Sequence, residues 1–187
     1  DVIYAADSSI KIGGEGSLKI TGTNVGIFAE YDIVISGSAL EINVDSIGMF
    51  TDYGNVTIDD STVKFNTGDN GIFAYNAGKI AVIDSTVEIH SGGDGIYAYD
   101  TVSISGGTLA IAADECGIYS ENSSVSISGS TLDIDAWEEG ISTYSGTVII
   151  NDSLARIAAD DYAIYTYDEE DVIIDDNLLM CDEYGEI

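Results

Sequence analysis

The stretch that decides the fold is GIYAYDTVSI, at residues 95–104. It repeats an earlier GIFAYNAGKI at 71–80 and returns as GIYSENSSVSI at 117–127. Self-similarity with a period of about 20 to 50 residues is typical of solenoids, propellers and other repeat arrays. The rest of the chain is therefore best divided into units that begin at this glycine.

The glycine that opens each unit recurs at nearly constant spacing. Successive units are 22 to 24 residues long, and they open at Gly26, Gly48, Gly71, Gly95, Gly117, Gly140, Ala163 and Gly185. Counting back 24 residues from Gly26 places the segment VIYAA, at residues 2–6, in an earlier unit. About eight units therefore account for the 187 residues.

Each unit contains three short stretches in which apolar and polar residues alternate. In one unit they lie at 96–99, 102–104 and 109–111, with glycine or small polar residues between them. Alternation with period two predicts strands, and three strands in about 23 residues without a helix predict the rung of a parallel β-helix. A left-handed hexapeptide helix would repeat near ~18 residues, so we predict an all-β, right-handed parallel β-helix.

Stacking of the units predicts three inward columns of apolar residues, each buried by the next unit. The first column is Ile27, Met49, Ile72, Ile96, Ile118, Ile141 and Ile164. The second is Ile35, Ile58, Val82, Ile104, Ile127, Ile150 and Ile174, and the third is Ile42, Phe65, Ile89, Ile111, Ile134, Ile157 and Cys181.

One turn position in every unit holds only glycine or aspartate. The residues are Gly37, Asp60, Asp84, Gly106, Gly129, Asp152 and Asp176. These residue types suit a left-handed backbone conformation, so we predict a tight turn there. The chain contains no proline, which agrees with rungs that all donate backbone N–H groups to their neighbours.

An aromatic residue follows the inward isoleucine in most units and is predicted to point outward. This column, the aromatic ladder, is Tyr4, Phe28, Phe50, Phe73, Tyr97, Tyr119, Ser142 and Tyr165. Two residues further lies a second outward column, the outer column, which is Ala6, Glu30, Asp52, Tyr75, Tyr99, Glu121, Tyr144 and Tyr167. Together they predict a long strip of rings and carboxylates that faces solvent.

Three interpretations of this strip are open. Pyranose rings present an apolar C–H face that packs on aromatic rings, while carboxylates and tyrosine hydroxyls bond the sugar hydroxyls, which favours a neutral glycan. The rings could instead stabilise the strands by stacking, or another domain could cover them. For glycan binding the candidate residues are Phe73, Tyr75, Tyr97, Tyr99, Tyr119, Tyr144, Tyr165 and Tyr167.

Acidic residues gather in the turn before each opening glycine. We call this group the acidic edge: Asp94, Asp114, Glu115, Glu138, Glu139, Asp160 and Asp161. Like charges on adjacent rungs repel, and either solvent counterions or a bound cation relieve this repulsion. Calcium accepts several such oxygens, so calcium is a candidate cofactor, although no complete calcium-binding repeat motif is present.

The composition excludes several classes of partner. A formal charge of −29 excludes nucleic acid and anionic membranes, whose binding depends on lysine and arginine. No apolar run reaches the ~18 residues of a membrane span. The two cysteines, Cys116 and Cys181, lie nearly three units apart, which is too far for a disulfide.

A polysaccharide lyase or hydrolase is the less favoured class. Pectate lyases and polygalacturonases are right-handed β-helices, but a lyase needs a cationic group near the uronate, and this chain has five basic residues. They are Lys11, Lys19, Lys64, Lys79 and Arg156, and the three that share an outward column are several rungs apart. The single histidine, His90, is expected to face solvent beside the core residue Ile89.

Residues 92–136, GGDGIYAYDTVSISGGTLAIAADECGIYSENSSVSISGSTLDIDA, resemble the repeats of bacterial extracellular β-helix proteins known as carbohydrate-binding domain-containing, within the pectate-lyase-like superfamily in the broad sense. The resemblance covers most of the chain and is strongest from 69 to 145. It implies secretion or display on a bacterial surface, and glycan contact without turnover. The alternative is a structural stalk or adhesin spacer.

The domain organisation is expected to be simple. Residues 1–187 form a single β-helix domain, which we expect to be a fragment of a longer modular protein. Because the open ends of a β-helix expose core and backbone, we also expect neighbouring domains or end-to-end contacts between chains to cover them.

Overall fold

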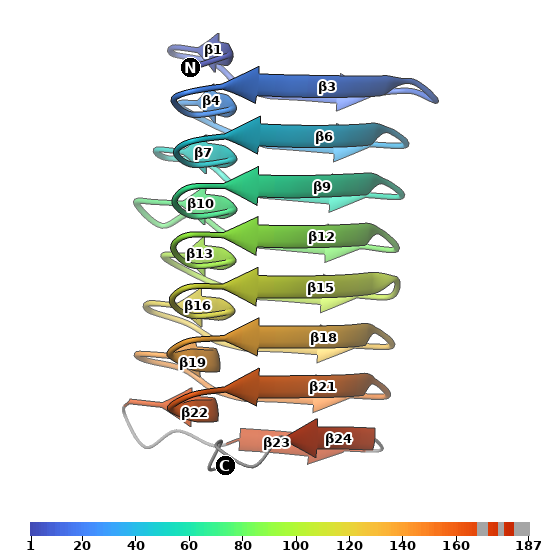
Figure 1. Cartoon of the computed structure of the whole chain (residues 1–187), viewed down its shortest axis with the longest axis vertical. Helices are drawn as coiled ribbons and strands as arrows, with labels where there is room; N and C mark the ends of the chain where they lie inside the picture. Colours follow the sequence, from blue (N-terminus) through green and yellow to red (C-terminus); the bar gives the residue numbers. More distant parts are fainter. Residues whose placement is uncertain (168–171, 176–177, 182–187) are drawn as a thin grey trace.

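The structure is a computed structural model that describes residues 1–167, 172–175 and 178–181. These residues form 24 strands and no helix, in three parallel eight-stranded sheets that run the length of the molecule (Figure 1). Each coil of the chain gives one strand to each sheet. The predicted parallel β-helix with three short strands per rung is confirmed.

Sheet A carries the aromatic ladder. Its strands are β1 (Ile3–Ala5), β4 (Ile27–Ala29), β7 (Met49–Thr51), β10 (Ile72–Ala74), β13 (Ile96–Ala98), β16 (Ile118–Ser120), β19 (Glu139–Thr143) and β22 (Tyr162–Thr166). Sheet B follows each of these strands after a loop. Its strands are β2 (Ile10–Gly13), β5 (Ile33–Ser36), β8 (Val56–Asp59), β11 (Ile80–Ile83), β14 (Val102–Ser105), β17 (Val125–Ser128), β20 (Val148–Asn151) and β23 (Val172–Asp175).

Sheet C has mostly longer strands and closes each coil. Its strands are β3 (Ser17–Gly22), β6 (Ala39–Val44), β9 (Thr62–Thr67), β12 (Thr86–Ser91), β15 (Thr108–Ala113), β18 (Thr131–Ala136), β21 (Leu154–Ala159) and β24 (Leu178–Cys181). Residues 1–20 belong to the first coil and form no separate cap. The unit that opens at Gly185 lies outside the described residues.

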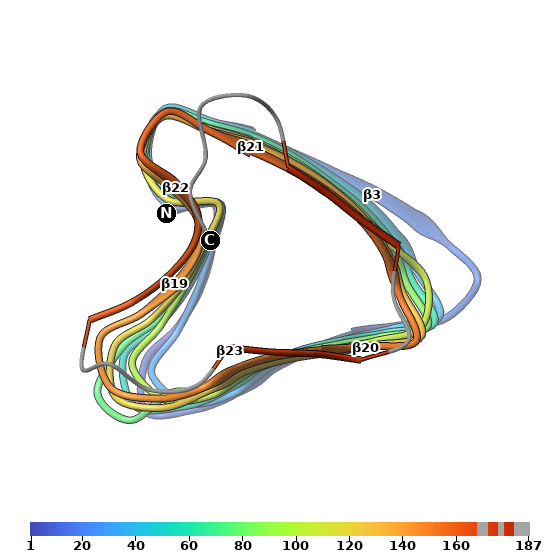
Figure 2. The ribbon, with the colours of Figure 1, turned by 90° about the horizontal axis from the view of Figure 1, so that it is seen from below.

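Viewed along its axis, the solenoid is a triangle whose sides are the three sheets (Figure 2). The chain runs counterclockwise as it advances toward the viewer at the C-terminal end, so the coil is right-handed. The side that contains β19 and β22 bends inward between its two corners. Sheet A therefore lies on the concave side of the molecule.

The three predicted apolar columns are confirmed. In sheet A, Ile72 pairs with Met49 on one side and with Ile96 on the other, and all three are fully buried. The columns of sheets B and C follow the predicted register as well, down to the pairing of Ile157 with Cys181. Burial of each such side chain stabilises the fold by about 1.5–3 kcal/mol, and only the neighbouring coils supply that burial.

The predicted tight turn lies between sheets B and C. The predicted residues that the structure describes all have a positive φ, between 45° and 67°: Gly37, Asp60, Asp84, Gly106, Gly129 and Asp152. Asp176, predicted to belong to the same set, lies outside the described residues. Aspartate tolerates this conformation because its short polar side chain bonds locally to the backbone.

In the described units that open with glycine, this residue is favoured for a different reason, which is close packing. A Cβ atom on Gly95 would lie 2.6 Å from the carbonyl oxygen of Gly117 and 2.5 Å from Cγ2 of Ile111. The same two kinds of neighbour confine Gly26, Gly48, Gly71, Gly117 and Gly140. The marker glycine therefore lets sheets A and C approach each other at this corner.

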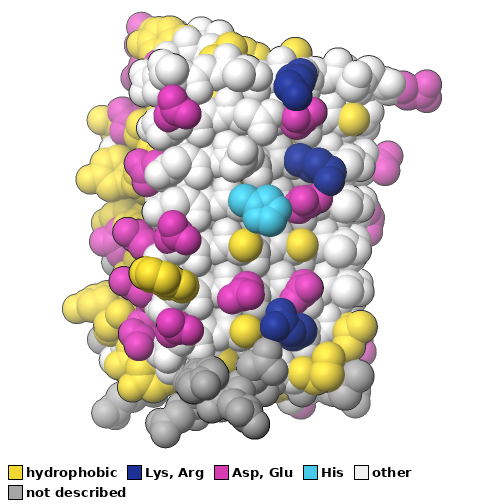
Figure 3. All heavy atoms as spheres, in the orientation of Figure 1, with side chains coloured by type: hydrophobic (Ala, Val, Ile, Leu, Met, Phe, Trp, Pro, Cys, Tyr) yellow, Lys and Arg dark blue, Asp and Glu magenta, His cyan; other side chains and the backbone are white. Residues whose placement is uncertain are grey.

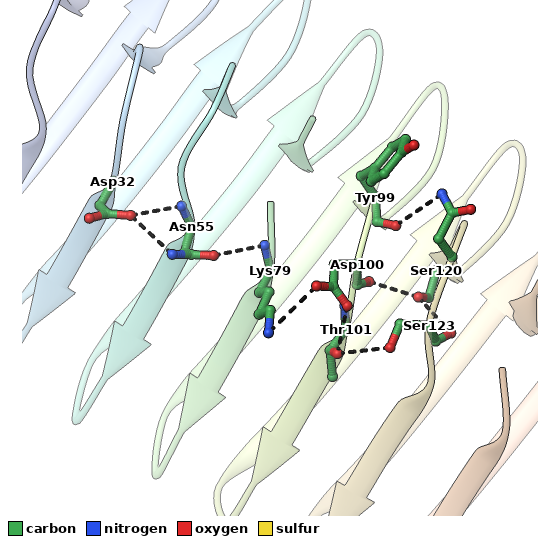
Figure 4. Close-up of polar contacts among 9 residues, drawn as sticks. Asp32, Asn55, Lys79, Tyr99, Asp100, Thr101, Ser120 and Ser123 are labelled. Atoms are coloured by element: carbon green, nitrogen blue, oxygen red, sulfur yellow. Dashed lines mark hydrogen bonds and ion pairs between the residues drawn. The ribbon is translucent and has the colours of Figure 1, made fainter. Parts of the chain in front are cut away.

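Polar side chains stack at the other two corners. At the turn between sheets B and C, the N–H of Ser61 donates to Oγ of Ser85, whose hydroxyl donates to the carbonyl of Ile83. Between sheets A and B, Oδ1 of Asp32 accepts two bonds from Asn55, and Oδ1 of Asn55 accepts the backbone N–H of Lys79 (Figure 4). These bonds satisfy backbone groups that the sheets leave unpaired.

The described residues contain no apolar helix of membrane-spanning length.

Candidate functional site

The aromatic ladder follows the predicted register on the outer side of sheet A. Cα pairing runs from Tyr4 through Phe28, Phe50, Phe73, Tyr97, Tyr119 and Ser142 to Tyr165. The first six rings form a continuous series, with centroid distances between neighbours from 4.7 to 5.3 Å. Each ring therefore contacts the ring on the next coil.

The ladder is less open to solvent than predicted. Tyr4 is 61% exposed, but every later ring of the ladder is only partly exposed. Tyr4 stacks on Phe28 at an interplanar angle of 12°, and Phe50 stacks on Phe73 at 13°. In these two pairs the ring faces are turned toward one another, whereas the other three neighbouring pairs of the ladder meet edge to face or at a tilt.

The outer column supplies the open aromatic surface. Tyr75, Tyr144 and Tyr167 are 42%, 50% and 46% exposed, and Tyr99 is partly exposed. The ring of Tyr75 lies 5.7 Å from Phe73 and 6.4 Å from Tyr99. Tyr75 therefore packs against the ladder, and Tyr99 packs against Tyr75.

Two pairs of outer rings are separated by a carboxylate. Tyr144 and Tyr167 lie 5.7 Å apart, and Glu121 occupies the column between this pair and the pair of Tyr75 and Tyr99. The hydroxyl of Tyr97 donates a hydrogen bond to Glu121. This carboxylate is therefore fixed among the rings, with acceptor capacity left for another donor.

The hydroxyls of the ladder residues Tyr97 and Tyr119 remain protonated. Burial, followed by the negative charge of Glu121, raises the pKa of Tyr119 to about 12. Burial and the hydrogen bond to Glu121 raise the pKa of Tyr97 as well. Neutral hydroxyls both donate and accept hydrogen bonds, as sugar hydroxyls do.

The ladder is interrupted at Ser142, and the interruption is not an open pocket. Ser142 is fully buried. From the next coil, the hydroxyl of Tyr167 donates to Oε1 of Glu139 at 3.3 Å, and burial together with the charge of Glu139 raises the pKa of Tyr167 to about 12. Sequence reasoning missed this bond, because it joins the outer column to the acidic edge.

The acidic edge divides into buried and exposed carboxylates. Asp94 and Glu139 are each only 8% exposed, so solvent counterions have little access to these two carboxylates. Both occupy the position directly before the opening glycine. At this position the side chain turns toward the corner between sheets A and C. The other five residues are exposed, as expected: Asp114, Glu115, Glu138, Asp160 and Asp161.

Burial changes the acid–base chemistry at this corner. Desolvation, with the charges of Glu115 and Glu138, raises the pKa of Asp94 to about 7, although the carboxylate accepts the N–H of Cys116 at 3.0 Å. Burial and the charge of Asp94 also raise the pKa of Cys116, whose thiol lies 3.1 Å from Oε2 of Glu139. A protonated, buried thiol is a poor nucleophile.

Cys116, Glu138 and Glu139 form a possible metal-binding group. One ligand atom from each lies within 4.8 Å of the others. Calcium prefers oxygen ligands, whereas a thiolate suits softer ions such as zinc, so this set differs from the predicted all-carboxylate site. Calcium binding along the acidic edge stays a prediction.

Most of the basic residues lie on another face. Lys19, Lys64 and Arg156 share the predicted outward column of sheet C, and each pairs with a carboxylate of an adjacent rung. His90 also lies on sheet C, exposed as predicted, with Nε2 3.4 Å from Glu88. The structure therefore separates the histidine and these cations from the rings of sheet A.

Comparison with known families identifies the family of this chain. The model of the carbohydrate-binding domain-containing protein family matches residues 1–123 and 75–178. The chain belongs to this family. The two matches overlap, as expected when one model fits successive repeats.

The family match confirms the resemblance seen in the repeats. The wider relation to pectate-lyase-like proteins stays a prediction. A search of curated proteins and a search of solved structures each gave no match.

Proposed function

We propose that this member of the family is a non-catalytic module that binds a neutral glycan along the concave face of sheet A. The observation that supports it best is the row of outer rings, in which Tyr75, Tyr144 and Tyr167 are exposed and Tyr99 is partly exposed, with Glu121 between the two pairs. The ladder rings Phe73 and Tyr165 pack against Tyr75 and Tyr167. A linear glycan would run along the axis, one or more sugar units against each pair.

The chemistry of the face suits an uncharged sugar. Ring faces pack against the C–H groups of a pyranose, and the hydroxyls of Tyr97 and Tyr119 with the carboxylate of Glu121 bond its hydroxyl groups. The charge of −29 repels uronic acids and sulfated chains, so a neutral polysaccharide is favoured.

A binding role accounts for this face better than catalysis. The carboxyl of Asp94 is buried under the protein's own backbone, and the thiol of Cys116 is protonated, so neither serves as an open nucleophile or base. The family description also names binding rather than a reaction. Because the repeats of this chain resemble those of bacterial extracellular β-helix proteins, we further propose that the chain acts outside the cell or on a bacterial surface.

The test replaces Tyr75 and Tyr99 together by alanine and measures binding to neutral plant and host polysaccharides by affinity electrophoresis. Aromatic contacts contribute about 0.5–1.5 kcal/mol each, so loss of two should cost about 1–3 kcal/mol, and we expect affinity to fall about five- to hundredfold while the melting temperature changes little. Trp137→Ala is the matched control, because Trp137 is 71% exposed and lies outside both columns. Unchanged retention of every polysaccharide that binds the natural chain would refute glycan binding at these rings.

The mutual contacts of the ladder favour a second role, that of a rigid stalk. If the rings are purely structural, Phe73→Ala and the Tyr75/Tyr99 double variant both lower the melting temperature, and no polysaccharide binds. If instead the ladder stabilises the sheet and the outer rings bind the glycan, Phe73→Ala lowers the melting temperature and the Tyr75/Tyr99 double variant lowers the affinity for polysaccharide.

A further inference from the structure

The outward column of sheet C alternates in charge from coil to coil. In the observed register it contains Lys19, Glu41, Lys64, Glu88, Ala110, Asp133 and Arg156. Adjacent members form ion pairs between Lys19 and Glu41, between Lys64 and Glu88, and between Arg156 and Asp133. Each pair joins two neighbouring rungs about 4.8 Å apart.

The alternation breaks at Ala110, where two acidic residues face each other across an apolar rung. Glu41 has a lysine on both neighbouring rungs, and the hydrogen bonds of Lys19 and Asn43, with the charges of Lys19 and Lys64, lower its pKa. In this column Glu88 and Asp133 each have a basic neighbour on one side only and share Ala110 on the other. A cation at the rung of Ala110 would complete the series.

A hollow lies at this break. Ala110 and Ala112 form its floor, Glu88 and His90 form one wall, and Asp133 and Asp135 form the other. Its volume is about 240 Å³, and Arg156 closes its far side. Figure 3 shows this face of the molecule, with the single histidine in cyan among acidic and small hydrophobic side chains.

We propose that this hollow, the sheet C hollow, binds a pyranose unit that carries a protonated amino group. The ammonium group takes the position between Glu88 and Asp133. The C–H face of the ring lies on the methyl groups of Ala110 and Ala112, and its hydroxyls reach His90 and Asp135. The site lies on a different face from the neutral-glycan site proposed above and shares with it only the class of ligand.

The width of the floor favours a ring over a lysine side chain. Ala110 and Ala112 are two residues apart on one strand and point to the same face, so their methyl groups span about 7 Å. A pyranose covers both methyl groups with one rigid face, whereas an alkyl chain must be held straight along the strand to do so and loses rotamer entropy. The ion pairs with Lys64 and Arg156 also draw Glu88 and Asp133 toward opposite walls, which suits a ligand broader than a bare metal ion. The overall charge of −29 attracts a cationic ligand.

The test measures binding of a glucosamine tetramer by calorimetry, at a pH where its amines are protonated. Ala110→Lys places a lysine ammonium in the proposed position, in a column that already holds Lys19 and Lys64, so the variant should fold and melt no lower than the natural chain. We expect it to lose binding. Glu88→Gln should weaken binding about tenfold, since a charged hydrogen bond contributes about 1.5–3 kcal/mol, while the control Glu41→Gln stays within about twofold.

Three results would overturn the proposal. The first is tetramer binding that survives Ala110→Lys. The second is equal binding of the N-acetylated tetramer, which would show that the ammonium contributes nothing. The third is equal binding of Nα-acetyl-lysine amide, which would show that the ring contributes nothing. The Tyr75/Tyr99 double variant keeps the two sites distinguishable, because it should lose neutral glycan and retain the glucosamine tetramer.

Discussion

At the scale of single residues, the buried carboxyl of Asp94 couples folding to pH. Its pKa is about 7 in the folded chain, against an ordinary value of 3.8, chiefly because burial disfavours the charged form. Between these two values the folded state holds a proton that the unfolded chain has released. The unfolded state therefore binds fewer protons, and the contribution of Asp94 to stability falls as pH rises from about 4 to about 7.

Replacing Asp94 by asparagine should remove this dependence. The amide oxygen of Asp94→Asn still accepts the N–H of Cys116, and the side chain has no charge to bury. We expect the variant to melt above the natural chain at about pH 8 and close to it at about pH 4, as followed by circular dichroism. Asp114→Asn, at an exposed position, is the control and should shift the curve by a small and constant amount. Parallel curves for Asp94→Asn and the natural chain would contradict the buried titration.

At the scale of the strands, the opening glycine sets how closely sheets A and C approach. Gly95→Ala would place its methyl group 2.6 Å from a backbone oxygen and 2.5 Å from Ile111, so either the strands or the isoleucine must move. Such overpacking costs about 1–3 kcal/mol, which urea denaturation measures directly. Gly16→Ala is the control, because a methyl group there meets nothing within 4 Å and should leave stability nearly unchanged. Equal midpoints for the two variants would show that the corner is looser than these distances indicate.

The strands and their register could be predicted because each inward position is repeated by a like residue one unit later. Ile96 is flanked by Ile72 and Ile118, and a shift of one residue would place Tyr97 in the core instead. The glycine-or-aspartate turn could be predicted for a similar reason, since the backbone conformation at Asp84 restricts the residue type.

The candidate site was harder to predict because it depends on the path of the turns. The position before the opening residue of each unit is buried at Val25, Asn70, Asp94, Cys116 and Glu139, half-buried at Ile47 and exposed at Tyr162. The apolar Val25 and Ile47 are the sequence signals that this column turns inward, and composition alone grouped Asp94 and Glu139 with the exposed carboxylates of the acidic edge. The bond from Tyr167 to Glu139 joins two coils through side chains of different columns, which repeat periodicity does not encode.

At the scale of the whole molecule, the solenoid separates its chemistry by face. Rings lie on the concave side formed by sheet A, and alternating charges lie along sheet C. The 34 acidic residues far outnumber the 5 basic ones, and stacking places many of them one rung apart. Repulsion between these charges opposes folding, whereas exposed ion pairs contribute only about 0–1 kcal/mol each.

Salt should therefore stabilise this protein. Raising NaCl shortens the screening length to about 8 Å near 0.15 M and about 3 Å at 1 M, which weakens repulsion between rungs more than it weakens the few ion pairs. We expect the melting temperature to rise by several degrees between low salt and about 0.5 M NaCl, since about 1 kcal/mol corresponds to 2–4 °C for a chain of this size. CaCl2 at equal ionic strength separates screening from specific binding. A larger rise in CaCl2, reversed by a chelator, would support calcium on the acidic edge, whereas equal rises would leave screening as the whole effect. A melting temperature that falls with NaCl would instead show that the ion pairs of sheet C outweigh the repulsion.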